Sequence, residues 1–232
     1  MKKILLVSGC SFTDKNFISD HHPEMNTDWR KWPEILAKKL DMDLINVAKC
    51  GAGNEYIYSS LVDKIITTDN IGLIISAWSQ VHRKDWKKKN KWFNNAETCN
   101  HSSFTDMEPW IDKSLRYFYS LQEVCKSKKI PYKAFCMLHP FRGYTWNKRL
   151  NKLVTENRKE LLQYIHNSPY FNKIDDSFIG WPGDPDLGGF SIKGDILLGY
   201  GQESYQYAIS ERDNHPNAKG QLKIAEFIYE QL

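Results

Sequence analysis

The sequence has no long apolar segment. None of its apolar runs approaches the roughly 20 residues that a membrane-spanning helix needs. The run near the N-terminus, residues 4–7, is also much shorter than the roughly 7 to 15 apolar residues of a secretory signal. We therefore expect a protein that has no membrane partner and that resides in the cytoplasm.

Cysteines are few, and their spacing does not suggest pairs. The chain has five, an odd number, and no two of them are separated by the two residues typical of metal-binding or redox motifs. This pattern argues against a disulfide framework and supplies no zinc ligands, so we expect reduced thiols and no metal site. The five are Cys10, Cys50, Cys99, Cys125 and Cys136.

Net charge is modest, +4 over 232 residues. One short stretch departs from this balance, because residues 82–91 carry six lysines and arginines against a single acid, Asp85. A solvated loop or helix face is the favoured interpretation. The alternative is a patch for an anionic polymer, with Trp86 and Trp92 interleaved among the charges. Nucleic acid is not the partner we expect.

The apolar pattern alternates between short continuous runs and longer stretches with helical spacing. Strands that alternate with helices predict βαβ units and a parallel sheet. We predict an α/β protein, a three-layer α/β/α sandwich with a five-stranded parallel sheet of flavodoxin-like topology. The strands are expected at residues 4–7, 44–47, 71–75, 131–138 and 174–179. The helices are expected at about residues 29–40, 54–67, 110–128, 147–166 and 216–231.

The length of the chain suits a single domain over residues 1–232 with two insertions. The first, at about 81–109, has little periodicity, and the second, at about 180–210, is rich in glycine, proline and aromatic residues. Long irregular segments of this kind are usually functional, so we expect both to form walls of a binding site. A third polar stretch, which contains His21 and His22, is interpreted as a surface loop.

A serine follows the first predicted strand. Residues 4–7 are apolar, and Ser11 comes directly after Gly9 and Cys10 in a segment that has lost the strand pattern. The carboxyl ends of parallel strands are where α/β proteins bind ligands, and a glycine lets the backbone turn tightly there. Ser11 is therefore a candidate nucleophile. The alternatives are a helix cap or a phosphate contact.

A histidine and an acid lie just before the last predicted helix. A serine hydroxyl is a weak nucleophile, which needs a base within hydrogen-bond reach and a carboxylate to orient that base. His215 and Asp213 could supply both. His139 ends a predicted strand and is the rival candidate for the base.

Three segments in this order resemble the conserved blocks of the SGNH (GDSL-type) hydrolases. Residues 9–13, Gly-Cys-Ser-Phe-Thr, resemble the first block; residues 46–54 resemble the second; and residues 213–217, Asp-Asn-His-Pro-Asn, resemble the last. The resemblance implies the same α/β/α architecture and ester hydrolysis through an acyl-enzyme, with no metal or organic cofactor. It also implies an oxyanion hole formed by the amides of Ser11 and Gly51.

The chain departs from the family pattern at two positions. The third block of the family usually supplies an asparagine to the oxyanion hole, whereas residues 75–80 of this chain contain none. Either Ser79 or Gln80 replaces that donor, or the site is weaker than in the family. The acid usually lies three residues before the histidine, where this chain has Arg212. Asp213 or Glu211 could orient His215 instead, or the serine and histidine could work as a dyad.

The function that these residues favour is hydrolysis of a small acyl ester by Ser11, His215 and Asp213. A small molecule or an acylated glycan is the expected substrate. The alternative is a non-catalytic carbohydrate- or ligand-binding module on the same scaffold, and a nucleic-acid binder ranks last. The sequence gives no sign of the oligomeric state. Residues expected to contact substrate are Trp78, Gln80, Asn54 and Trp181, with Ser79 as a third contributor to the oxyanion hole.

Overall fold

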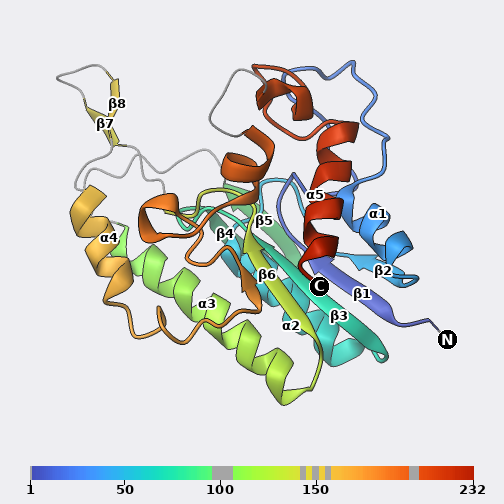
Figure 1. The fold of residues 1–232 in the computed structure, drawn as a ribbon, viewed down its shortest axis with the longest axis horizontal. Helices are drawn as coiled ribbons and strands as arrows, with labels where there is room; N and C mark the ends of the chain where they lie inside the picture. The colour runs from blue at the N-terminus through green and yellow to red at the C-terminus, as the bar shows by residue number, and fades with distance from the viewer. Residues whose placement is uncertain (1, 96–106, 142–144, 148–151, 155–157, 199–203) are drawn as a thin grey trace.

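A computed structural model describes residues 2–95, 107–141, 145–147, 152–154, 158–198 and 204–232. Five parallel strands form the central sheet, in the order β2-β1-β3-β6-β9 (Figure 1). If these five strands are numbered by their order in the chain, the sheet order is 2-1-3-4-5, which is the order of flavodoxin-like proteins. The predicted fold class is therefore confirmed. The strands are β1 (Ile4–Ser8), β2 (Asp43–Asn46), β3 (Ile71–Trp78), β6 (Tyr132–Cys136) and β9 (Phe178–Ile179).

Helices cover both faces of the sheet. α1 (Trp32–Lys39) and α5 (Ala218–Glu230) pack together on one face, and α2 (Asn54–Thr67) packs with α3 (Glu108–Ser127) on the other (Figure 1). Side chains alternate along β1 accordingly: Leu6 joins the core on the α2/α3 side, whereas Leu5 and Val7 join the core on the α1/α5 side. Both sides of this strand are buried, which explains its continuous apolar character.

The first insertion contains an antiparallel hairpin, β4 (Lys84–Lys88) and β5 (Lys91–Asn95), where the sequence suggested no regular structure. Lys89 and Asn90 form its two-residue turn, both with positive φ, as hairpin turns with the twist of the strands require. The second insertion contains short helical turns, η2 (Pro185–Leu187), η3 (Ile192–Leu198) and η4 (Ser204–Tyr207). Residues 96–106 lie outside the described part of the chain.

One predicted helix is wrong in its extent. A helix was expected over residues 147–166, but a second antiparallel pair, β7 (Thr145–Asn147) and β8 (Lys152–Val154), precedes α4 (Arg158–His166). In α5 the buried positions are Gly220, Gln221, Ile224, Ala225 and Ile228.

Two further expectations can be compared with the described residues. Cys10, Cys125 and Cys136 are buried free thiols, as predicted, whereas Cys50 is exposed; Cys99 lies outside the described part. Within that part, none of the helices has the length and apolar character needed to cross a membrane.

Candidate active site

A tight turn carries Ser11 at the end of β1. The backbone N–H groups of Thr13 and Asp14 both donate to the carbonyl of Cys10, at 2.8 and 3.0 Å. Gly9 is needed for this turn, because a Cβ at that position would lie 2.5 Å from Thr13 Oγ1. The turn therefore depends on close backbone packing that other residues would prevent.

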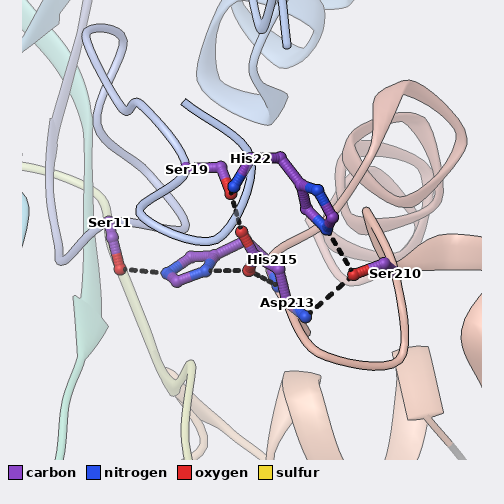
Figure 2. Close-up of polar contacts among 6 residues, drawn as sticks. All are labelled: Ser11, Ser19, His22, Ser210, Asp213 and His215. Atoms are coloured by element: carbon purple, nitrogen blue, oxygen red, sulfur yellow. Dashed lines mark hydrogen bonds and ion pairs between the residues drawn. The ribbon is translucent and has the colours of Figure 1, made fainter. Parts of the chain in front are cut away.

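Ser11 and His215 are 204 residues apart in the chain, and the fold brings their side chains into hydrogen-bond contact (Figure 2). Ser11 Oγ lies 2.8 Å from His215 Nε2, and His215 Nδ1 lies 2.5 Å from Asp213 Oδ1 (Figure 2). The backbone N–H of His215 also donates to Asp213 Oδ1, at 3.0 Å. This local turn explains how an acid only two residues before the histidine reaches its ring. Glu211, the alternative acid, is exposed, and among the described residues Asp213 is the acid that bonds to the His215 ring.

The rival histidine lies elsewhere. The ring of His139 is buried against the η3 segment, where a Cβ added at Gly194 would fall 1.9 Å from His139 Nε2. His215, not His139, is the imidazole hydrogen-bonded to Ser11.

Burial and hydrogen bonding act in opposite directions on the pKa values of the histidine and the acid. Burial lowers the pKa of His215 below its ordinary value of 6.5, although Asp213 opposes the shift. Burial alone would raise the pKa of Asp213, but hydrogen bonds from Ser19 and His215 outweigh it, and the pKa of the carboxyl is lowered. At neutral pH the pair is therefore an imidazole able to accept a proton beside an ionised carboxylate.

Two aromatic rings fix the plane of the imidazole. Phe17 stacks on His215 with ring centroids 4.1 Å apart, and Phe12 lies tilted against it at 4.8 Å. Both phenyl rings are buried. They limit rotation of the imidazole and keep water from its faces, leaving its two nitrogens directed at Ser11 and Asp213.

A second layer of polar groups, missed by the sequence analysis, surrounds Asp213 (Figure 2). Ser19 donates its hydroxyl hydrogen to Asp213 Oδ2, and the backbone N–H of His22 donates to Ser19 Oγ at 3.0 Å. Ser210 Oγ accepts from the Asp213 N–H at 3.0 Å and lies 2.8 Å from His22 Nε2. His22, interpreted from sequence as part of a surface loop, thus links two supports of the carboxylate.

The loop after β2 lies beside the Ser11 turn. The N–H of Lys49 donates to the carbonyl of Gly9 at 3.0 Å, and the N–H of Cys50 donates to Asp14 Oδ2 at 2.7 Å. Gly51 follows with a positive φ of 74°, which favours glycine. Among the described residues, neither the Ser11 N–H nor the Gly51 N–H donates to a protein acceptor.

Ser79, expected to be a third donor to the oxyanion hole, lies at the end of β3 with its backbone paired to Asn54. The Ser79 N–H donates to Asn54 Oδ1 at 2.9 Å, and the Ser79 side chain is fully buried. Asn54, expected to contact substrate, uses its amide nitrogen on the Ser79 carbonyl and on Ser114 Oγ. The Ser79 backbone is thus paired, whereas its hydroxyl has no hydrogen-bond partner among the described residues, and a role for Ser79 in the oxyanion hole stays a prediction. Gln80 is half-buried, and its Oε1 accepts from Arg83 Nε at 3.4 Å.

The two tryptophans expected to line the site belong to an aromatic core. Trp78 is fully buried, with its ring centroid 4.6 Å from that of Phe118. Trp181 is half-buried against Phe178, at 5.0 Å between centroids, and its Nε1 donates to the Phe171 carbonyl at 3.1 Å. In this conformation both side chains serve packing, and their contact with a substrate stays a prediction.

The described residues contain no group of three or more histidine, cysteine, aspartate or glutamate side chains arranged to hold a metal ion. The contacts at Ser11 bring together a hydroxyl, an imidazole and a carboxylate. Such a set can transfer a proton from a nucleophile.

Neither a protein-family model nor a curated protein matches the sequence. Solved structures do match. One is described as a lipolytic protein of the G-D-S-L family from Desulfitobacterium hafniense DCB-2, with 12% identity over 100% of both chains and a TM-score of 0.53. Another is a psychrotrophic esterase, EstA, from Pseudoalteromonas, with 12% identity over 99% of this chain and 96% of that one and a TM-score of 0.49. The first likeness shows that the chain has the SGNH/GDSL hydrolase fold over its full length.

Proposed function

We propose that the protein is a serine esterase that hydrolyses a small acyl ester through Ser11, His215 and Asp213. The observation that carries the proposal is the chain of contacts from Ser11 Oγ to His215 Nε2, at 2.8 Å, and from His215 Nδ1 to Asp213 Oδ1, at 2.5 Å. A nucleophile, a base and an orienting acid in this sequence are the requirements of acyl transfer.

The first half of the reaction forms an acyl-enzyme. His215 Nε2 accepts the hydroxyl proton as Ser11 Oγ attacks the ester carbonyl, and the electron pair of the C=O bond moves onto its oxygen. The amides of Ser11 and Gly51 donate to that oxyanion. The tetrahedral intermediate collapses, the C–O bond to the leaving alcohol breaks, and the imidazolium returns its proton to the alcohol.

The second half releases the acid. Water enters the site vacated by the alcohol and gives a proton to His215, and the resulting hydroxide attacks the acyl carbonyl. Collapse of this second intermediate breaks the bond to Ser11 Oγ, which regains its proton from His215. Asp213 stays ionised throughout and stabilises the imidazolium that forms in each half.

An acylated sugar or polysaccharide is the substrate we favour. The support is the aromatic surface of the first insertion, where Trp86 and Phe93 are exposed. Apolar ring faces and a few polar groups are the usual means of holding a small ligand in one orientation.

A second candidate is a non-catalytic binding module, favoured by the end of β3. The family's asparagine is missing there, and the Ser79 N–H is already bonded to Asn54. Losing one oxyanion donor typically costs about 10²- to 10³-fold in rate. A module of this kind would bind its ligand equally well after Ser11→Ala.

Hydrolysis of 4-nitrophenyl acetate and of a peracetylated monosaccharide tests the proposal. We expect turnover by the wild type and none above background by Ser11→Ala. A wild type that is folded and cleaves no short acyl ester in a broad screen would contradict the esterase and favour the binding module.

A further inference from the structure

The β4–β5 hairpin has two faces of different character. Side chains alternate across a strand, and the cross-strand pairs are 84↔95, 85↔94, 86↔93, 87↔92 and 88↔91. One face of the hairpin, here called the inner face, carries Asp85, Lys87, Trp92 and Asn94. The opposite, outer face carries Lys84, Trp86, Lys88, Lys91 and Phe93.

The inner face is fastened to the loop that bears Gly51. Asp85 accepts hydrogen bonds from the N–H groups of Gly53, at 2.9 Å, and Tyr56, at 3.0 Å. Asn94 Nδ2 donates to the carbonyl of Cys50 at 2.8 Å. Because the same loop bonds to the Ser11 turn through Lys49 and Cys50, the hairpin is held beside the candidate active site rather than projecting freely from it.

The outer face exposes a pair of stacked rings. Trp86 is 46% exposed and Phe93 is 42% exposed, and their ring centroids lie 5.9 Å apart with an interplanar angle of 15°. Two large apolar side chains in water on a short hairpin contribute little to folding of this protein, since the inner face already supplies the attachment. The two rings together form one exposed apolar surface, here called the platform.

Lysines flank this platform in an arrangement that is unfavourable without a ligand. Lys88 and Lys91 are direct cross-strand partners, and like charges directly opposite one another destabilise a hairpin. Lys89 adds a third exposed charge in the turn. Among the described residues, no carboxylate forms an ion pair with any of the three. An anion bound at this end would relieve the repulsion.

We propose that the outer face of the hairpin binds a carboxylated polysaccharide, the polymer whose ester groups reach Ser11. Sugar rings would lie on the platform of Trp86 and Phe93, and uronate carboxylates would pair with Lys88, Lys89 and Lys91. This inference rests on the proposed esterase for the link to Ser11, whereas the binding itself does not require catalysis.

A polysaccharide suits this surface better than a single-stranded nucleic acid does. Proteins that bind single strands stack successive bases on separate aromatic side chains along a basic groove. Here Trp86 and Phe93 stack on each other as one platform. The basic stretch is short, and the net charge of the whole chain is only +4.

The test is affinity electrophoresis in gels that contain polygalacturonate, neutral xylan or no polymer, using the Ser11→Ala protein so that nothing is consumed. Retardation by polygalacturonate and not by xylan is expected, with an apparent Kd that weakens as salt rises. Trp86→Ala should raise the Kd at least about tenfold, as loss of a stacking aromatic does in comparable sites. Lys88→Gln with Lys91→Gln should raise it similarly and flatten the salt dependence.

Two control variants match these changes elsewhere on the surface. Tyr229→Ala removes a comparably exposed aromatic ring from α5, and Lys128→Gln with Lys129→Gln removes the same charge near the end of α3. Both should bind as the parent does. The proposal is overturned if polygalacturonate does not retard the parent, if the hairpin variants bind like the controls, or if an oligo(dT) strand binds more tightly than polygalacturonate.

Cleavage of 4-nitrophenyl acetate is measured separately, with the protein that retains Ser11. This assay distinguishes failure of the binding proposal from failure of the proposed esterase. Circular dichroism and the midpoint of thermal unfolding, which should match those of the parent, show that the hairpin variants fold. Binding of polygalacturonate by a protein without any esterase activity would leave the hairpin assignment standing and remove the catalytic one. Esterase activity in a protein that does not bind polygalacturonate would leave the catalytic assignment standing and remove the hairpin assignment.

Discussion

The two sides of the Ser11 hydroxyl differ in how their polar groups are paired. On the side of His215, the ring nitrogens, both Asp213 oxygens and the supporting hydroxyl of Ser19 all have partners within the described structure. On the side of β3, Asn54 pairs with the Ser79 backbone, and the Ser79 hydroxyl has no hydrogen-bond partner among the described residues. In the proposed esterase, proton transfer would use the paired groups around His215, whereas the oxyanion would depend on the backbone amides of Ser11 and Gly51.

This difference has a physical consequence for mutants. Side chains in a connected hydrogen-bond network act as a unit, so that removing one member impairs the others. Backbone amides are unaffected by side-chain truncation. Substitutions around His215 should accordingly cost far more activity than substitutions around Ser79 and Gln80.

The largest effect is expected for Ser11→Ala. Without the hydroxyl no acyl-enzyme can form, and we expect kcat for 4-nitrophenyl acetate to fall by at least about a thousandfold. Ser127→Ala, which removes an exposed hydroxyl on α3, is the matched control and should be silent. A rate within tenfold of wild type for Ser11→Ala would show that hydrolysis occurs elsewhere.

The second-largest loss of activity is expected for Asp213→Asn, about 10² to 10⁴-fold in kcat. The imidazole would lose both its orientation and the charge that stabilises its protonated form. Glu211→Gln removes the alternative acid and should leave kcat within about threefold, because the Glu211 side chain is exposed. Comparing kcat of these two variants decides which carboxylate serves His215. A larger loss for Glu211→Gln would reverse the assignment.

The pH profile tests the same side of the site without mutation. His215 must be neutral to accept the proton, and burial holds its pKa below 6.5. Activity should therefore be complete at neutral pH and fall on acidification, with kcat/KM halved at a pH below 6.5. Because Asp213 raises the pKa of His215, the residual activity of Asp213→Asn should lose half its value at a still lower pH. A midpoint above 6.5 in the wild type would contradict the assignment.

Ser19→Ala should have an intermediate effect. Its hydroxyl donates to Asp213 Oδ2, and a hydrogen bond to a charged group contributes about 1.5 to 3 kcal/mol. We expect kcat to fall about tenfold, with KM unchanged, because Asp213 keeps its bonds to His215. A change in KM alone would indicate that Ser19 contacts substrate instead of supporting the acid.

The smallest effects are expected for substitutions on the β3 side of Ser11. Ser79→Ala and Gln80→Ala should each leave kcat within about threefold, since the oxyanion is assigned to backbone amides. A loss of about 10² to 10³-fold for either variant would identify it as the replacement for the missing asparagine. Steady-state kinetics at saturating substrate would separate the two outcomes.

The sequence predicted the fold because apolar runs are local patterns, and it predicted the grouping of Ser11, His215 and Asp213 because three segments resemble the blocks of a known family. Continuous apolar runs such as residues 71–75 mark buried parallel strands, and a short turn suffices to bring Asp213 to His215. The supports of Asp213 could not be predicted in this way. Ser19 lies 194 residues from Asp213 in the chain, and only the completed fold brings them together.

The β4–β5 hairpin was missed for a different reason. Its turn is formed by Lys89 and Asn90 with positive φ and contains no glycine, so the usual hairpin signal is absent. The outer face mixes Lys88 and Lys91 with Trp86 and Phe93, which hides the alternation of apolar and polar residues on which strand prediction depends.

Labelling with a fluorophosphonate probe, followed by peptide mass spectrometry, tests most directly whether Ser11 is an activated nucleophile. The account predicts phosphonylation of Ser11 in the wild type and its loss in His215→Ala, because the hydroxyl needs the imidazole to accept its proton. An unlabelled Ser11 in the folded wild type, or equal labelling of both proteins, would contradict it.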